Sequence, residues 1–108
     1  MTGEGILVRD CMREKIHRVT PYVRKVESDE ELLILLRKKL LEECGELLTA
    51  PTPEDALEEM GDVLQVLRLW SHLIGYNFGH VERARQEKWR LKGGFGSGMV
   101  LAWKQPEE

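Results

Sequence analysis

The sequence lacks several features that would place it in particular classes of protein. It has two cysteines, Cys11 and Cys44, which form no CxxC motif and are too few for a disulfide framework. No apolar signal segment stands at the N-terminus, and the longest nearly apolar run, residues 32–36, is far too short to cross a bilayer. We therefore expect a reduced, cytoplasmic protein with no membrane partner.

An excess of positive charge is also missing. The 16 Lys and Arg residues are outnumbered by 19 Asp and Glu residues, which gives a formal net charge of −3. A nucleic-acid partner is not expected, because no surplus of basic charge exists to displace the counterions of a phosphate backbone. What is present, 42% hydrophobic and 32% charged residues in a chain of 108, suits one helix-rich domain over residues 1–108 with a modest core.

Start and stop signals for helices divide most of the chain. Ser28 and Glu31 form a capping box that begins a helix over about residues 29–49. Thr52 as N-cap and Pro53 at the first helical position begin a second helix, over about residues 53–74, which Gly75 ends. The link between these helices is only a few residues long, so they should pack antiparallel. A weaker amphipathic helix follows over about residues 78–91.

The two ends of the chain are less clearly patterned. Residues 9–18 suit a short helix, and the apolar runs 6–8 and 99–103 have strand propensity, with a pairing between them as one option. The predicted fold class is all-α, an antiparallel helical bundle, with short strands at the termini left open. Two long helices and one short one do not enclose a polar site alone, so we expect oligomerisation to complete the bundle.

Two pairs of carboxylates lie in the two long predicted helices, Glu43 with Glu46 and Glu59 with Asp62. Each pair has i,i+3 spacing, which places both acids on one side of a helix. Three of these acids are in phase with the apolar stripes of their helices, and Glu46 lies at the edge of one. The stripes are Leu33, Leu36, Leu40 and Leu47 in the first helix and Val66, Leu69 and Leu73 in the second.

Two neighbouring acids have a different phase. Glu42 and Glu58 lie in line with polar side chains, and we expect both to face solvent. At a rise of about 1.5 Å per residue, both inward pairs lie roughly 6–14 Å from the turn between the helices. The four inward acids are therefore predicted to be nearly level and to face each other.

Four carboxylates turned toward a core cannot all ionise there without compensation. Divalent cations would supply it, and oxygen-only ligands select hard ions, Mg²⁺ or Mn²⁺. The alternative is an ordinary solvated acidic face, which is the usual condition of charged helical residues.

Several stretches resemble one protein family. Residues 42–46 (EECGE) fit an EExxE motif and residues 59–62 (EMGD) fit an ExxD motif. The two motifs together resemble those of the all-α nucleoside triphosphate pyrophosphohydrolases, the MazG-like and phosphoribosyl-ATP pyrophosphatase-like proteins. Residues 6–10 (ILVRD) and 88–95 (KWRLKGGF) resemble the opening and the basic helix end of the second branch.

The resemblance implies a Mg²⁺-dependent hydrolase, with Mn²⁺ as a second option, that cleaves a nucleotide triphosphate to the monophosphate and pyrophosphate. It implies that Glu43, Glu46, Glu59 and Asp62 are metal ligands. Glu43 and Glu46 are the candidate catalytic residues, with Glu46 as the helper that orients and deprotonates water. Members of the family are dimeric or tetrameric, so we expect a homodimer or homotetramer.

Candidate substrate-binding residues lie near both ends of the chain. Lys88 would contact phosphate, although a solvated face explains this residue equally well. Weaker candidates are Arg85, Lys92, Phe95 and Arg9. Many relatives carry Asn, Lys, an aromatic residue and Arg near the end of the last helix, where this chain has Gln86, Lys88, Trp89 and Lys92.

Three functions follow from these patterns. The first is hydrolysis of a non-standard or surplus (d)NTP to the (d)NMP, as in nucleotide-pool cleaning. The second is the phosphoribosyl-ATP pyrophosphatase step of histidine biosynthesis, since resemblance to that branch does not fix the substrate. The third is a non-catalytic helical interaction module whose acids are only solvated.

Overall fold

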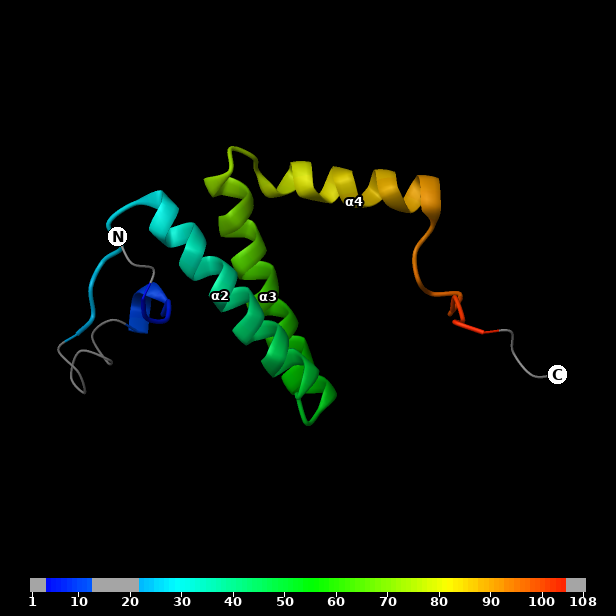
Figure 1. Cartoon of the computed structure of the whole chain (residues 1–108), viewed down its shortest axis with the longest axis horizontal. Coiled ribbons are helices and arrows are strands. Elements are labelled where there is room, and N and C mark those ends of the chain that lie inside the picture. Colours follow the sequence, from blue (N-terminus) through cyan, green and yellow to red (C-terminus); the bar gives the residue numbers. More distant parts are fainter. Residues whose placement is uncertain (1–3, 13–21, 105–108) are drawn as a thin grey trace. The chain divides into compact units, whose positions relative to one another are not determined.

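The computed structural model describes residues 4–12 and 22–104 (Figure 1). Its elements are a 3₁₀ turn, η1 (Asp10–Met12), and three α-helices, α2 (Asp29–Leu48), α3 (Pro53–Leu73) and α4 (Phe78–Lys92). The chain forms two compact units, Met1–Phe78 and Gly79–Glu108. The all-α class is confirmed, because the described residues contain helices and no strand.

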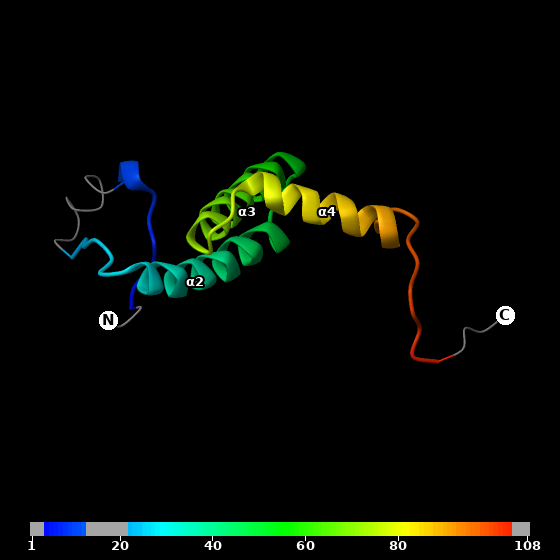
Figure 2. The ribbon, with the colours of Figure 1, turned by 90° about the horizontal axis from the view of Figure 1, so that it is seen from above.

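Helices α2 and α3 form an antiparallel hairpin and lie side by side in both views (Figures 1 and 2). The Ser28 hydroxyl accepts from the Glu31 N–H to cap α2, and the Thr52 hydroxyl accepts from the Asp55 N–H to cap α3. Helix α3 ends before Gly75, whose φ of 94° is in the left-handed region that favours glycine. The predicted helices and their antiparallel packing are therefore confirmed, with boundaries shifted by a residue at their C-termini.

The hairpin buries few hydrophobic side chains. Among the described residues, only Leu35, Leu36 and Val66 are buried hydrophobics. Leu36 and Val66 belong to the predicted stripes, whereas Leu69, predicted to lie in the core, is 37% exposed. A hairpin has two helices only, so a stripe residue away from their line of contact gains little cover from the facing helix.

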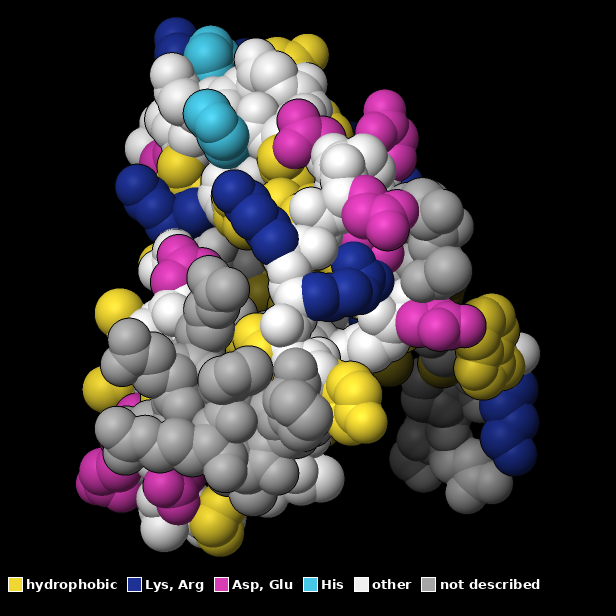
Figure 3. Space-filling model, turned by 90° about the vertical axis from the view of Figure 1, so that its left-hand side faces the viewer, with side chains coloured by type: hydrophobic (Ala, Val, Ile, Leu, Met, Phe, Trp, Pro, Cys, Tyr) yellow, Lys and Arg dark blue, Asp and Glu magenta, His cyan; other side chains and the backbone are white. Residues whose placement is uncertain are grey.

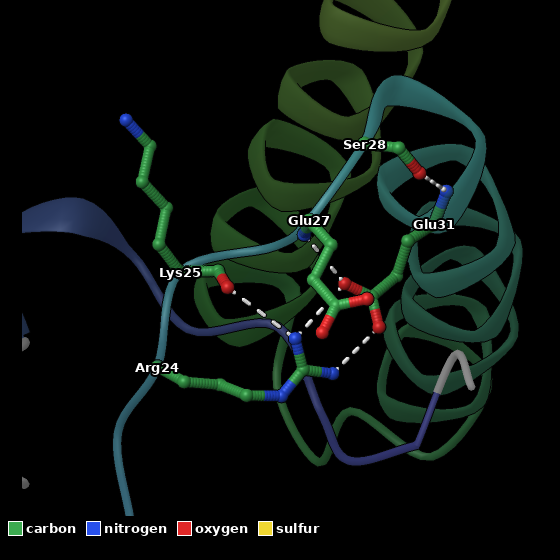
Figure 4. Close-up of polar contacts among 5 residues, drawn as sticks. All are labelled: Arg24, Lys25, Glu27, Ser28 and Glu31. Atoms are coloured by element: carbon green, nitrogen blue, oxygen red, sulfur yellow. Dashed lines mark hydrogen bonds and ion pairs between the residues drawn. The ribbon is translucent and has the colours of Figure 1, made fainter. Parts of the chain in front are cut away.

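The segment before α2 is fastened to the first turn of that helix (Figure 4). The Arg24 guanidinium donates to both oxygens of the Glu31 carboxylate, at 2.9 and 2.6 Å, and to the Lys25 carbonyl at 3.3 Å. The Glu27 N–H also donates to Glu31, at 2.9 Å. Glu31 is fully buried, so these partners replace the water that its charge would otherwise hold.

The second unit contains most of α4 and the glycine-rich tail. Helix α4 carries i,i+3 ion pairs between Glu82 and Arg85 and between Glu87 and Arg90. Every described residue from 83 onward is exposed, including the apolar residues of the tail. These are Phe95 at 99%, Met99 at 89%, Val100 and Leu101 at 86%, and Trp103 at 98% exposed.

Two expectations for the chain ends need correction or fall outside the described residues. The option of strands at 6–8 and 99–103 is wrong, because neither segment pairs and both stay as extended or irregular chain. Strand propensity alone does not make a strand, since a strand needs an edge to pair with. Within residues 9–12 the expected helix appears as the 3₁₀ turn η1, and the rest of the predicted range, 13–18, lies outside the described part.

Nothing among the described helices has both the length and the apolar character needed to cross a bilayer. On the face drawn in Figure 3, acidic and basic side chains are interspersed with hydrophobic ones.

Candidate metal centre

Three of the four predicted acids meet where α2 and α3 pack. One carboxylate oxygen each from Glu43, Glu46 and Glu59 lies within 4.8 Å of the other two. Glu43 and Glu46 come from successive turns of one helix and Glu59 comes from the facing helix, as the depth argument predicts. We call this set, Glu43, Glu46 and Glu59, the carboxylate cluster.

The cluster contains buried oxygens without partners. Glu43 is only 6% exposed, Glu59 is half-buried and Glu46 is exposed. The Oε2 atoms of Glu43 and Glu59 are buried and accept no hydrogen bond from any described residue. A buried carboxylate oxygen without a donor is costly, so these two atoms are the strongest indication that the cluster takes a cationic ligand.

The surroundings of Glu59 raise the pKa of its carboxyl. The pKa of Glu59 is about 7, and burial is the largest cause of this rise. Hydrogen bonds with Glu46 and Glu43, and the charges of Glu46 and Asp62, act in the same direction. Without a cation, a proton on Glu59 is what relieves the repulsion between the carboxylates. A divalent cation bound here would therefore compete with this proton for the same oxygens.

Two basic side chains already touch these acids. Lys39 lies 3.3 Å from Glu43 Oε1 and 3.3 Å from Glu42 Oε1. Partial burial works to lower the pKa of Lys39, but its hydrogen bonds to Glu42 and Glu43 and their charges outweigh burial and raise it. Arg9, on the segment 4–12, forms an ion pair with Asp62.

Asp62 is thus engaged differently from the other three predicted ligands. It lies one helical turn beyond Glu59, its side chain is 32% exposed, and it pairs with Arg9 instead of joining the cluster. Sequence reasoning identified Arg9 as a candidate substrate contact but did not anticipate this pair. It missed Lys39 altogether, although the i,i+4 spacing from Lys39 to Glu43 was a usable signal.

The division of the acids by phase is confirmed. Glu42 and Glu58, expected to face solvent, are both exposed, whereas Glu43, one residue along from Glu42, is buried. The EExxE motif alone does not separate its first two acids; the apolar phase of the helix does.

The candidate substrate residues of α4 and the tail lie in the second unit. Lys88, Arg85, Lys92 and Phe95 are all exposed. Arg85 pairs with Glu82. A hollow of about 500 Å³ at the end of α4 is lined by other residues, namely Trp89, Arg90, Gly93, Gly94, Gly96 and Ser97. The part of Lys88, Arg85, Lys92 and Phe95 in substrate binding stays a prediction.

The cluster fits a hard divalent cation by its chemistry. All its donor atoms are carboxylate oxygens, which suit Mg²⁺ or Mn²⁺ better than softer metals. Two of those oxygens are buried and lack donors. Three carboxylates in one place favour a counter-charge, of which Lys39 supplies part.

Comparisons with models of protein families, with curated proteins and with solved structures find no match for this chain.

Proposed function

We propose that this protein is a Mg²⁺-dependent nucleoside triphosphate pyrophosphohydrolase, which cleaves a (d)NTP to the (d)NMP and pyrophosphate. The observation that carries the proposal is the carboxylate cluster, in which Glu43 and Glu59 each keep a buried oxygen without a donor. Support also comes from the two acidic motifs, EExxE and ExxD, that the sequence places on facing helices.

Each acid has a part in this proposal that follows from its surroundings. Glu43 and Glu59, the two more buried members of the cluster, hold the cation together with Glu46. Asp62 becomes a further ligand once Arg9 releases its carboxylate. A bound Mg²⁺ would neutralise charge on the triphosphate oxygens. Glu46 is exposed, so it can accept a proton from a water that approaches from solvent.

A second copy of the chain completes the proposed site. The hairpin leaves a row of hydrophobic side chains on α3 exposed, at i, i+3, i+7 and i+10 spacing. These are Leu57, Met60, Leu64 and Leu67, which are 70, 54, 43 and 37% exposed. Monomeric proteins seldom expose a continuous apolar row of this kind. We propose that a homodimer or homotetramer buries it.

The test is pyrophosphate release from a panel of canonical and modified (d)NTPs and phosphoribosyl-ATP, with Mg²⁺ present. We expect hydrolysis of at least one member and a loss of about 100-fold or more in kcat/KM for Glu43→Gln. Glu42→Gln is the matched control, because Glu42 is the adjacent acid of the same motif and faces solvent.

Two results would contradict the proposal. One is equal activity in the wild type and in Glu43→Gln. The other is no release from any nucleotide together with no rise in thermal stability on adding Mg²⁺ or Mn²⁺, since a cation bound to the folded state must stabilise it. The second result would favour a non-catalytic interaction module.

A further inference from the structure

Arg9 and Asp62 form an ion pair although they lie 53 positions apart in the chain. Arg9 belongs to the N-terminal segment 4–12, and Asp62 lies on α3 one turn after Glu59. The guanidinium Nη2 donates to Asp62 Oδ1. One of the four predicted metal ligands is therefore held by a cation that belongs to the chain itself.

The two basic residues beside the acids are held in different ways. Lys39 lies on α2 four residues before Glu43, so the helix keeps it near the cluster. Arg9 lies on a segment that is mostly exposed, since Ile6 is 72% and Val8 42% exposed and Leu7 is its one half-buried side chain. The Arg9 side chain is itself 61% exposed. Arg9 can therefore leave at small cost, whereas Lys39 cannot move far.

We propose that Arg9 is an exchangeable counter-ion of the metal centre. It holds Asp62 while no divalent cation is bound, and it leaves together with segment 4–12 when a cation takes Asp62 as a ligand. This inference rests on the proposed function, because it requires that the carboxylate cluster binds a cation. Glu43, with a buried oxygen lacking a donor, is the fixed part of that site, and Asp62 is the part that changes partner.

The exchange has a consequence for the substrate. A guanidinium is a planar donor that matches phosphate oxygens as well as carboxylates. Once released from Asp62, Arg9 is available to an anionic ligand at the same centre. Because coupling is reciprocal, docking of segment 4–12 and binding of the cation oppose each other.

The first experiment measures Mn²⁺ affinity by calorimetry on the full chain, without substrate. We expect Arg9→Gln to bind Mn²⁺ about 2- to 5-fold more tightly than the wild type, since an exposed ion pair is modest in strength. In an Asp62→Asn background the same change should have little effect, because the amide carries no charge for Arg9 to neutralise and none for a cation to gain. This double-mutant cycle separates a specific exchange from a general loss of positive charge.

The second experiment measures amide hydrogen exchange in residues 4–12. Mn²⁺ should speed exchange in this segment in the wild type, and it should not do so in Asp62→Asn. Arg83→Gln, a charge loss on α4 outside the proposed site, is the matched control and should behave as the wild type in both experiments.

The outcomes separate this inference from the proposed function. If the wild type binds no Mn²⁺, both fail. Suppose that the wild type binds Mn²⁺ but Arg9→Gln leaves the affinity unchanged, or raises it by the same factor with and without Asp62→Asn. The release of Arg9 is then overturned, while the proposed metal centre stands. Slower amide hydrogen exchange in residues 4–12 on adding Mn²⁺ would also overturn the proposed release of Arg9.

Discussion

At the scale of single residues, neighbouring acids on these helices have opposite surroundings. Glu43 is 6% exposed, while the adjacent Glu42 faces solvent. Glu59 is half-buried beside two other carboxylates, while the adjacent Glu58 is exposed. A single step of 100° around a helix makes this difference, so each buried acid has an internal control one residue away.

Glu59 should make the metal-free protein less stable as the pH rises. Its pKa is about 7 in the folded chain against 4.5 as a reference. The folded state therefore binds a proton that the unfolded state has lost, and the stability from that proton is present below about pH 4.5 and is lost between about pH 4.5 and 7. In EDTA, we expect the melting temperature to fall over this range less in Glu59→Gln than in the wild type.

Thermal unfolding at pH 5 and pH 8 measures this effect, with Glu58→Gln as the control. From pH 5 to pH 8, the melting temperature should fall less in Glu59→Gln than in the wild type. In Glu58→Gln it should fall as much as in the wild type. The same pH dependence in all three proteins would show that the carboxylate cluster does not hold a proton.

At the scale of elements, the start of α2 carries more than an ordinary cap. Ser28 accepts from the Glu31 N–H at 3.1 Å, as the capping-box pattern predicts. The Glu31 side chain, however, is fully buried and accepts from Arg24 as well as from the Glu27 N–H. The hydrogen bonds with Arg24 raise the pKa of that guanidinium. This carboxylate therefore fixes both the helix and the segment before it.

Loss of Glu31 should cost more stability than loss of the cap alone. Ser28→Ala removes one acceptor and should cost about 1 kcal/mol, as should Thr52→Ala at the start of α3. Glu31→Ala keeps the backbone N–H that Ser28 caps, but it removes the acceptor of Arg24 and of the Glu27 N–H and leaves a cavity at a fully buried position, so its cost should exceed both. Urea unfolding of the three variants at one protein concentration checks the order. A smaller loss for Glu31→Ala than for Ser28→Ala would contradict it.

At the scale of the whole molecule, the described core is too thin for a hairpin that stands alone. Only three hydrophobic side chains of the described residues are buried, while the row on α3 that contains Leu57 and Leu64 stays exposed. Small domains bury a low fraction of their surface and need additional support to be stable. The proposed oligomer would supply it by covering the exposed row.

Charge placed in this row should dissociate the oligomer. We expect the wild type to sediment at a multiple of its 12.5 kDa chain mass, and Leu57→Lys/Leu64→Lys to sediment as the monomer. Leu101→Lys, at an 86% exposed position of the tail, should leave the mass unchanged. Analytical ultracentrifugation decides the question. A wild type that is monomeric, or a double variant that keeps the wild-type mass, would exclude this row as the contact.

The bounds of the helices and the phase of the acids follow from local signals along the chain. Capping residues, Pro53 and Gly75 act locally, so they set the bounds of α2 and α3 to within a residue or two. The 3.6-residue period assigned Glu43 to the packed face and Glu42 to solvent, because phase on one helix depends only on spacing along it.

Which charges meet depends instead on how separate segments pack. Spacing along α3 treats Glu59 and Asp62 alike, yet Glu59 joins Glu43 and Glu46 while Asp62 pairs with Arg9. Arg24 likewise finds the buried Glu31. Contacts between separate segments depend on the register of the helices and on the path of the intervening chain, and no local periodicity encodes either of these.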